Sequence, residues 1–275
     1  MIKDMKILKW HIAALRRYAL CSLFSILYSL LGACAKYDPI LPGDRTPVFA
    51  GEEPTIQNTE IPRDVLVRAI GAGNSSKLNT QHSTLKYEQT PDNEIFEIGA
   101  DGARRRIFSG FPTAAHVSAR RAPLAVGGFI YAGLSTGEVV KINPKTREVK
   151  WAADIYKPSI LTGGSGGVLD IVAQPVLDDK YVYAGGLGGA FCKLRDSSGE
   201  KIWCNWISVS APFSIYTGLA FVISTDDGLY AINTNDGGIY WRRDTRCTSA
   251  PELVQIGDDF IIKCTAGRRK EEFRI

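Results

Sequence analysis

A pattern of short strand-like segments recurs along residues 123–241, and it constrains the fold of this chain more than any other feature. Each copy begins at a proline, runs through an apolar segment and a turn glycine, and ends at a tryptophan. The proline and the tryptophan are 28, 28 and 29 residues apart in the pairs Pro123–Trp151, Pro175–Trp203 and Pro212–Trp241. Four short runs per copy and a period of roughly forty residues are typical of propeller blades. We therefore predict an all-β propeller of four-stranded antiparallel blades.

The residue types within each copy fit the strands and turns of such a blade. The second run is apolar on both faces, as in Tyr181-Val-Tyr183, which indicates a strand covered by sheets on both sides. Gly137, Gly189 and Gly228 open the third run, where a tight turn needs a positive φ. The tryptophan at the end of each copy offers a large ring to pack on the next blade and an indole N–H to donate to a carbonyl.

This repeat resembles that of quinoprotein-type β-propellers, and among them the BamB-type lipoproteins that assist outer-membrane β-barrel assembly. The resemblance rests on a proline, the run Tyr181-Val-Tyr-Ala-Gly185, a turn glycine, and a Ser-Gly or Thr-Gly step before the tryptophan. It implies a scaffold without enzyme activity or cofactor. It also implies a partner, the central barrel-inserting protein of the barrel-assembly machinery, which blade loops and edge strands would contact, including by strand addition.

The first 33 residues have the composition of an export leader. A basic start precedes an apolar stretch, Tyr18–Leu31, that is too short to span a bilayer of ~30 Å as a helix. The stretch ends in Leu31-Gly-Ala-Cys34, which matches a bacterial lipobox, so Cys34 is the predicted lipidation site. An ordinary membrane anchor with an incidental cysteine is the alternative. Because Ala35 rather than Asp follows the cysteine, we expect the periplasmic face of the outer membrane.

The basic charge of the chain belongs to this leader. The whole chain has 33 Lys and Arg against 29 Asp and Glu, and residues 1–33 contain five basic residues and one acidic residue. The remaining residues therefore carry 28 charges of each sign. Nothing in this balance calls for nucleic acid, and clusters such as Arg104-Arg-Arg106 and Arg242-Arg243 are interpreted as solvated faces.

We divide the chain into a leader, a Pro-rich tether over residues 34–60 and propeller repeats over residues 61–275. A similar Pro-rich segment follows the lipidated cysteine in BamB-type proteins. The predicted blades span about 122–155, 173–208, 210–245 and, in part, 249–275.

The ends of the repeat region are harder to interpret. Val65–Ile70 is predicted as a short strand. Ile95–Gly99 is predicted as the last strand of a blade, with Phe96 in place of tryptophan, and this strand would close the ring by completing the final blade. Residues 268–275 show no strand alternation. Three blades and part of a fourth leave apolar faces uncovered. The chain is therefore either a shortened member or one that completes a ring by self-association.

Neither the histidines nor the acidic residues form a recognisable catalytic or metal motif. The acidic pairs, such as Asp178-Asp179, fall between predicted strands, where turn chemistry explains them. Propellers of this type that oxidise alcohols with pyrroloquinoline quinone use an adjacent Cys-Cys pair, which this sequence lacks. A scaffold is the favoured interpretation. A degenerate propeller without stable function and a quinone-dependent oxidoreductase remain as alternatives.

The cysteines suggest a disulfide and no zinc site. Cys192 and Cys204 lie on the two arms of one predicted hairpin, nearly in register, where a cross-strand disulfide would contribute on the order of 3 kcal/mol. Two packed thiols are the alternative. Cys247 and Cys264 lack the spacing and the nearby histidine of a zinc site.

Mass spectrometry of the protein isolated from cell envelopes tests the first pair. We expect one disulfide-linked peptide that contains Cys192 and Cys204. Free thiols at both positions would refute the pairing.

Overall fold

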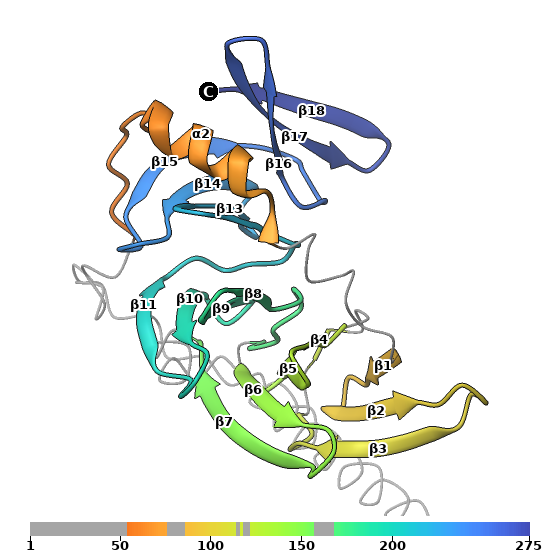
Figure 1. Ribbon diagram of the computed structural model, residues 1–275. Helices are drawn as coiled ribbons and strands as arrows, with labels where there is room; N and C mark the ends of the chain where they lie inside the picture. The colour runs from red at the N-terminus through yellow and green to blue at the C-terminus, as the bar shows by residue number, and fades with distance from the viewer. Residues whose placement is uncertain (1–53, 76–85, 114–115, 118–121, 157–167) are drawn as a thin grey trace, which may run out of the picture. The chain divides into compact units, whose positions relative to one another are not determined.

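The computed structural model describes residues 54–75, 86–113, 116–117, 122–156 and 168–275. These residues form five antiparallel sheets and a helix, so the predicted all-β fold is confirmed (Figure 1). The predicted leader, the lipidation site Cys34 and most of the predicted tether lie outside the described residues. Within the described part of the chain, no helix has the length and apolar character needed to span a membrane.

Three four-stranded sheets occupy the central part of the chain, and we call them blades 1, 2 and 3. Each is a meander in which consecutive strands pair, and together they contain every copy of the repeat that ends in tryptophan. Blade 1 contains β4 (Leu124–Val126), β5 (Phe129–Gly133), β6 (Glu138–Asn143) and β7 (Glu148–Asp154). Blade 2 contains β8 (Val176–Asp178), β9 (Tyr181–Gly186), β10 (Ala190–Arg195) and β11 (Lys201–Asn205). Blade 3 contains β12 (Ser214–Tyr216), β13 (Leu219–Ile223), β14 (Gly228–Asn233) and β15 (Ile239–Asp244).

Two three-stranded sheets flank the blades in sequence. The first contains β1 (Lys86–Gln89), β2 (Glu94–Ile98) and β3 (Arg104–Ser109). The second, which we call the C-terminal sheet, contains β16 (Glu252–Ile256), β17 (Asp259–Ala266) and β18 (Arg269–Arg274). The prediction that residues 268–275 lack a strand is therefore wrong, because β18 pairs with β17 along its whole length.

The first sheet also corrects the prediction for residues 95–99. This segment is the middle strand of its sheet and does not complete the final blade. In each blade the fourth strand has a bulge, one extra residue directly before the tryptophan. The first sheet has the same bulge directly before Phe108, which pairs with Ile95. Phe108, and not Phe96, therefore occupies the tryptophan position.

The segment before the first sheet packs on blade 3. Ile56 forms a parallel bridge with Ile239, and the amides of Gln57 and Thr59 donate to the carbonyls of Ile239 and Tyr240 at 2.9 Å each. The end of the predicted tether is thus bound to the outer edge of β15. Helix α2 (Arg63–Ala72) follows.

Helix α2 replaces the short strand predicted at residues 65–70. Val65, Leu66 and Ala69 lie on one helical face and are buried, a spacing that suits a helix better than a strand. Pro62 precedes the helix, and Gly73, with φ of 78°, follows it, as is common at helix ends.

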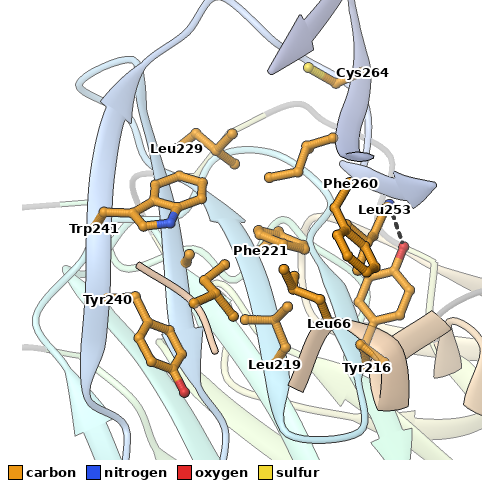
Figure 2. Close-up of a cluster of buried hydrophobic side chains, with 14 of the residues drawn as sticks. Leu66, Tyr216, Leu219, Phe221, Leu229, Tyr240, Trp241, Leu253, Phe260 and Cys264 are labelled. Carbon is orange, nitrogen blue, oxygen red and sulfur yellow. Dashed lines mark hydrogen bonds between the residues drawn. The ribbon is translucent and has the colours of Figure 1, made fainter. Parts of the chain in front are cut away.

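The core consists of apolar layers between consecutive sheets. The layer on blade 3 joins α2 and the C-terminal sheet to β13 and β14, through side chains such as Leu66, Phe221 and Phe260 (Figure 2). The amide of Leu253 donates to the Tyr216 hydroxyl at 2.8 Å, which fixes β16 against β12. Burying each large apolar side chain of this kind contributes about 1.5–3 kcal/mol.

A lysine and a tryptophan join one blade to the next at two junctions. Lys141 and Trp151 face each other across β6 and β7, and both donate to the main-chain oxygen of Asp196, with Nζ–O and Nε1–O distances of 3.2 and 2.7 Å. Lys193 and Trp203 make the same contacts with the oxygen of Thr234, at 2.7 and 3.2 Å. We call this arrangement the Lys–Trp clamp.

The clamp requires glycine in the turn that it holds. Gly199 follows Asp196 in blade 2 and has φ of 73°, and a Cβ there would lie 2.8 Å from the Trp151 ring. Gly237 in blade 3 has φ of 80°, and a Cβ there would lie 2.9 Å from the Trp203 ring. The tryptophan ring therefore packs directly on the glycine backbone.

Replacing Gly199 by alanine tests this contact. Gly102 is the matched control, because its φ is 79° but no heavy atom lies within 4 Å of its Cβ position. Both variants should lose about 1–2 kcal/mol to the left-handed backbone. Gly199→Ala should lose about 1–3 kcal/mol more, from the clash with Trp151. Urea unfolding measures both, and equal losses would contradict the close contact.

Candidate interaction surface

The residues predicted from the repeat have different structural roles. Trp151 and Trp203 act in the two clamps, whereas Trp241 faces Ala231, which has no donor, across β14 and β15. The guanidinium of Arg243 lies over the Trp241 ring at 4.7 Å. A cavity of about 650 Å³ lies beside Trp241, and Phe260 also lines it.

The turn glycines agree with the prediction at two of three positions. Gly137 and Gly189 have φ of 84° and 83°. The prediction is wrong for Gly228, because the preceding Asp227 takes the left-handed conformation with φ of 58°. Space constrains Gly228 instead, since a Cβ there would lie 2.6 Å from Nε of Arg242.

The described residues contain two disulfides. Cys192 and Cys204 pair directly across β10 and β11, with a Cα–Cα distance of 4.1 Å. Cys247, after β15, is joined to Cys264 on β17, with a Cα–Cα distance of 5.8 Å. Sequence reasoning did not foresee the second pair, because Cys247 lies in the segment between β15 and β16 and no hairpin brings it into register with Cys264.

Two of the arginine clusters form ion pairs. Arg104, Arg105 and Arg106 on β3 pair with acidic residues of their own sheet. Arg242 pairs with Asp226 and Asp244. The Arg242–Asp226 pair borders a groove.

A groove of about 460 Å³ lies where the segment after β11 crosses the β13–β14 turn, and we call it the Trp206 groove. Trp206, Tyr230 and Arg242 line it together with serine hydroxyls and Asp226. Trp206 is the one tryptophan after the leader that lies outside the repeat position. That departure is the signal by which the sequence could have revealed the groove.

Backbone contacts fix the two sides of the groove. The amide of Thr225 donates to the carbonyl of Ser208 at 2.9 Å, and Val209 bridges Ser224. The amide of Gly228 donates to the Ser224 hydroxyl at 3.0 Å, which closes the turn. The linker between blades 2 and 3 is therefore attached to the turn of blade 3.

The charged groups of the groove form a connected set. The Ser224 hydroxyl donates to Asp226 Oδ1, and this hydrogen bond, followed by the positive charge of Arg242, lowers the pKa of the Asp226 carboxyl. Arg242 donates to Asp226 Oδ2 at 3.3 Å and to Asp244 Oδ1 at 2.6 Å. The groove thus presents a fixed anion, a fixed cation and two aromatic rings.

The two clamps differ in their electrostatics. In the first, the Tyr131 hydroxyl and Lys141 Nζ donate to Asp196 Oδ1 at 2.6 and 2.8 Å. Burial, and then the hydrogen bond to Asp196, raises the pKa of Tyr131. In the second, Lys193 Nζ lies 4.0 Å from the centre of the Tyr181 ring, and burial lowers the pKa of Lys193.

A family model described as "Outer membrane protein assembly factor BamB" matches residues 76–246. The protein of that name from Kangiella koreensis is 23% identical over 146 residues, which are 50% of this chain and 37% of the relative. The one from Francisella tularensis subsp. tularensis is 27% identical over 126 residues, 45% of this chain and 27% of the relative. The matches therefore span about a third of the length of these relatives.

Two solved structures share the fold. BamB from Moraxella catarrhalis aligns with a TM-score of 0.50 and 16% identity, over 69% of this chain and 62% of that one. A europium-containing methanol dehydrogenase aligns with a TM-score of 0.50 and 10% identity, over 66% of this chain and 46% of that one. At these identities the two structures show the propeller fold alone.

The raised pKa of Tyr131 predicts a loss of stability at alkaline pH. Above the ordinary tyrosine pKa of 10.0, the unfolded chain releases the Tyr131 proton while the folded protein keeps it, so the free energy of unfolding falls as pH rises. Tyr131→Phe should unfold about 1.5–3 kcal/mol more easily at neutral pH, since it loses a hydrogen bond to a carboxylate. Its free energy of unfolding, measured with urea, should also fall less steeply between pH 9 and 11 than that of the wild-type protein. The lowered pKa of Lys193 has the opposite effect on stability, but Lys193 is present in both proteins. An unchanged slope of the free energy of unfolding against pH in Tyr131→Phe would therefore contradict the assignment to Tyr131.

Proposed function

Because this chain belongs to the family of outer membrane protein assembly factors of the BamB type, we propose that it is a periplasmic scaffold for the assembly of outer-membrane β-barrel proteins. Its partner is the central barrel-inserting protein of the assembly machinery. The lipid on Cys34 holds it at the periplasmic face of the outer membrane. It acts through protein–protein contacts and is not an enzyme.

The observation that carries this proposal is the composition of the Trp206 groove. Trp, Tyr and Arg are the residue types that most often supply binding energy at protein interfaces, and the groove contains Trp206, Tyr230 and Arg242. The linker and the turn that hold these side chains are joined by backbone hydrogen bonds. A partner that enters the groove therefore meets a preformed surface and orders few side chains on binding.

Asp226 in the groove and Asp196 in the first clamp have structural roles that do not involve chemistry. Asp226 accepts from Ser224 and pairs with Arg242, and Asp196 accepts from the Tyr131 hydroxyl and Lys141. The shared fold with a methanol dehydrogenase supplies no site residue to this chain. The groove therefore favours a binding protein over a quinone-dependent oxidoreductase.

Affinity purification of the tagged, full-length lipoprotein from detergent-solubilised envelopes tests the proposal. The wild-type protein should recover the central barrel-inserting protein. Trp206→Ala and Arg242→Ala should each reduce that recovery by about tenfold or more, as interface hot spots do. Arg195→Ala is the matched control, because Arg195 also forms an exposed ion pair, with Glu200, but lies on β10 outside the groove.

The outcomes separate the parts of the proposal. If the wild-type protein recovers no assembly component, the scaffold function is wrong. Recovery that is equal in all four proteins would leave the scaffold function standing but would refute the groove as the binding surface.

The variant Cys34→Ala tests the lipid anchor. Mass spectrometry should show that it lacks the acyl chains, and it should leave the membrane fraction. A variant that stays in the membrane fraction with the acyl mass would refute Cys34 as the lipidation site.

A further inference from the structure

Three ligand atoms of different strands and loops converge beside the C-terminal sheet. Cys247 lies in the segment after β15, Cys264 lies on β17, and Glu271 faces Cys264 directly across β17 and β18. The two sulfur atoms and a carboxylate oxygen of Glu271 all lie within 4.8 Å of one another. Both cysteines are buried, and Cys264 borders the core on blade 3 (Figure 2).

The Glu271 carboxylate is held by neutral donors. Its Oε2 accepts from the Thr245 hydroxyl at 2.8 Å and from the amide of Arg246 at 3.3 Å, and it lies 3.5 Å from Sγ of Cys247. Among the described residues, no Lys or Arg side chain forms an ion pair with Glu271. The carboxylate is thus aimed at the sulfurs, with its negative charge not balanced by a cation.

The disulfide does not satisfy this carboxylate, because a bonded sulfur has no proton to donate. Two thiolates and a carboxylate would carry three negative charges around one point. Cysteine sulfur and carboxylate oxygen are established zinc ligands, at about 2.3 Å and about 2.0–2.2 Å from the metal. Thiolate ligands also favour zinc over magnesium or calcium.

We propose that Cys247, Cys264 and Glu271 form a redox-gated binding site for zinc or another thiophilic divalent cation. In the oxidised protein the two sulfurs are bonded and the site is closed. A dithiol reductant breaks the Sγ–Sγ bond with two electrons and two protons and leaves as its own disulfide. The cation then displaces one proton from each thiol and binds both sulfurs and the carboxylate, with solvent at the fourth position.

Both states link the same parts of the protein. The disulfide joins the end of blade 3 to β17. The metal would join the end of blade 3 to both β17 and β18, because Glu271 is on β18. The site therefore keeps the C-terminal sheet attached to blade 3 whether the surroundings oxidise or reduce the cysteines.

The other disulfide is an internal control. Cys192 and Cys204 are also joined by a disulfide, which the same reductant can open. Among the described residues, however, they are not part of any cluster of three metal-ligating side chains, whereas Cys247 and Cys264 are. Reduction should therefore create one metal site in the chain.

Cobalt binding to the mature lipoprotein, purified in detergent, tests the proposal. The protein is compared as purified and after reduction with a phosphine that is then removed without oxygen. The reduced protein should bind about one Co²⁺ per chain with sulfur-to-metal charge-transfer absorption, and Zn²⁺ should abolish that absorption. The oxidised protein should show none. If the reduced wild-type protein shows no such absorption, the proposal is wrong.

Variants assign the ligands. The double variant Cys192→Ala/Cys204→Ala should keep the charge-transfer band, and Cys247→Ala/Cys264→Ala should lose it. Glu271→Gln should weaken zinc affinity by about 10–100-fold, measured by competition with a chromophoric chelator. A band that survives in the Cys247/Cys264 variant, or an unchanged affinity in Glu271→Gln, would refute the assigned site.

Discussion

The carbonyl that each Lys–Trp clamp holds is the constraint on which the arrangement of the blades depends. Two donors from neighbouring strands, one charged and one neutral, converge on one main-chain oxygen of the next blade. Such convergence depends on a lysine and a tryptophan that face each other, on a bulge directly before the tryptophan, and on a glycine in the next turn on which the ring can lie. The equal spacing from Lys141 to Trp151 and from Lys193 to Trp203 follows from these requirements, because a residue inserted between them would move one donor off the carbonyl.

The clamp is absent where the repeat meets the rest of the described chain, and other contacts take its place. At the start of the repeat, Ile95 and Phe108 occupy the two donor positions, and the junction is an apolar layer. At its end, Ala231 replaces the lysine beside Trp241. There the edge of β15 is covered by the segment before α2, and a disulfide joins the end of β15 to the C-terminal sheet. At these two junctions, buried apolar contacts and a disulfide replace the hydrogen bonds to one main-chain oxygen.

These differences explain which parts of the structure the sequence predicts. The blades are predictable because their strands, turns and tryptophans repeat at a fixed local spacing. Helix α2 was missed because Val65–Ile70 is short and apolar, and periodicity alone does not separate a buried strand from a helix in so short a run; Pro62 and Gly73 were the better signal. β18 was missed because its sequence, Arg-Lys-Glu-Glu-Phe-Arg, has a single apolar side chain, Phe273, and therefore no alternation of polar and apolar residues. Phe108 could not be placed at all, since its equivalence to tryptophan depends on the bulge directly before it, and a bulge is a property of pairing and not of spacing.

The candidate sites follow from the same reasoning. Residues that the repeat requires already have hydrogen-bond partners within the fold. Lys141 and Trp151, for example, both donate to Asp196. A partner is better bound by side chains that the repeat does not require. Trp206 is such a side chain, because it lies in a linker between blades, and so is Glu271, whose carboxylate makes no ion pair within the described chain. In a protein built from copies of one unit, the departures from the copy are therefore the places where binding chemistry can be added without loosening the blades.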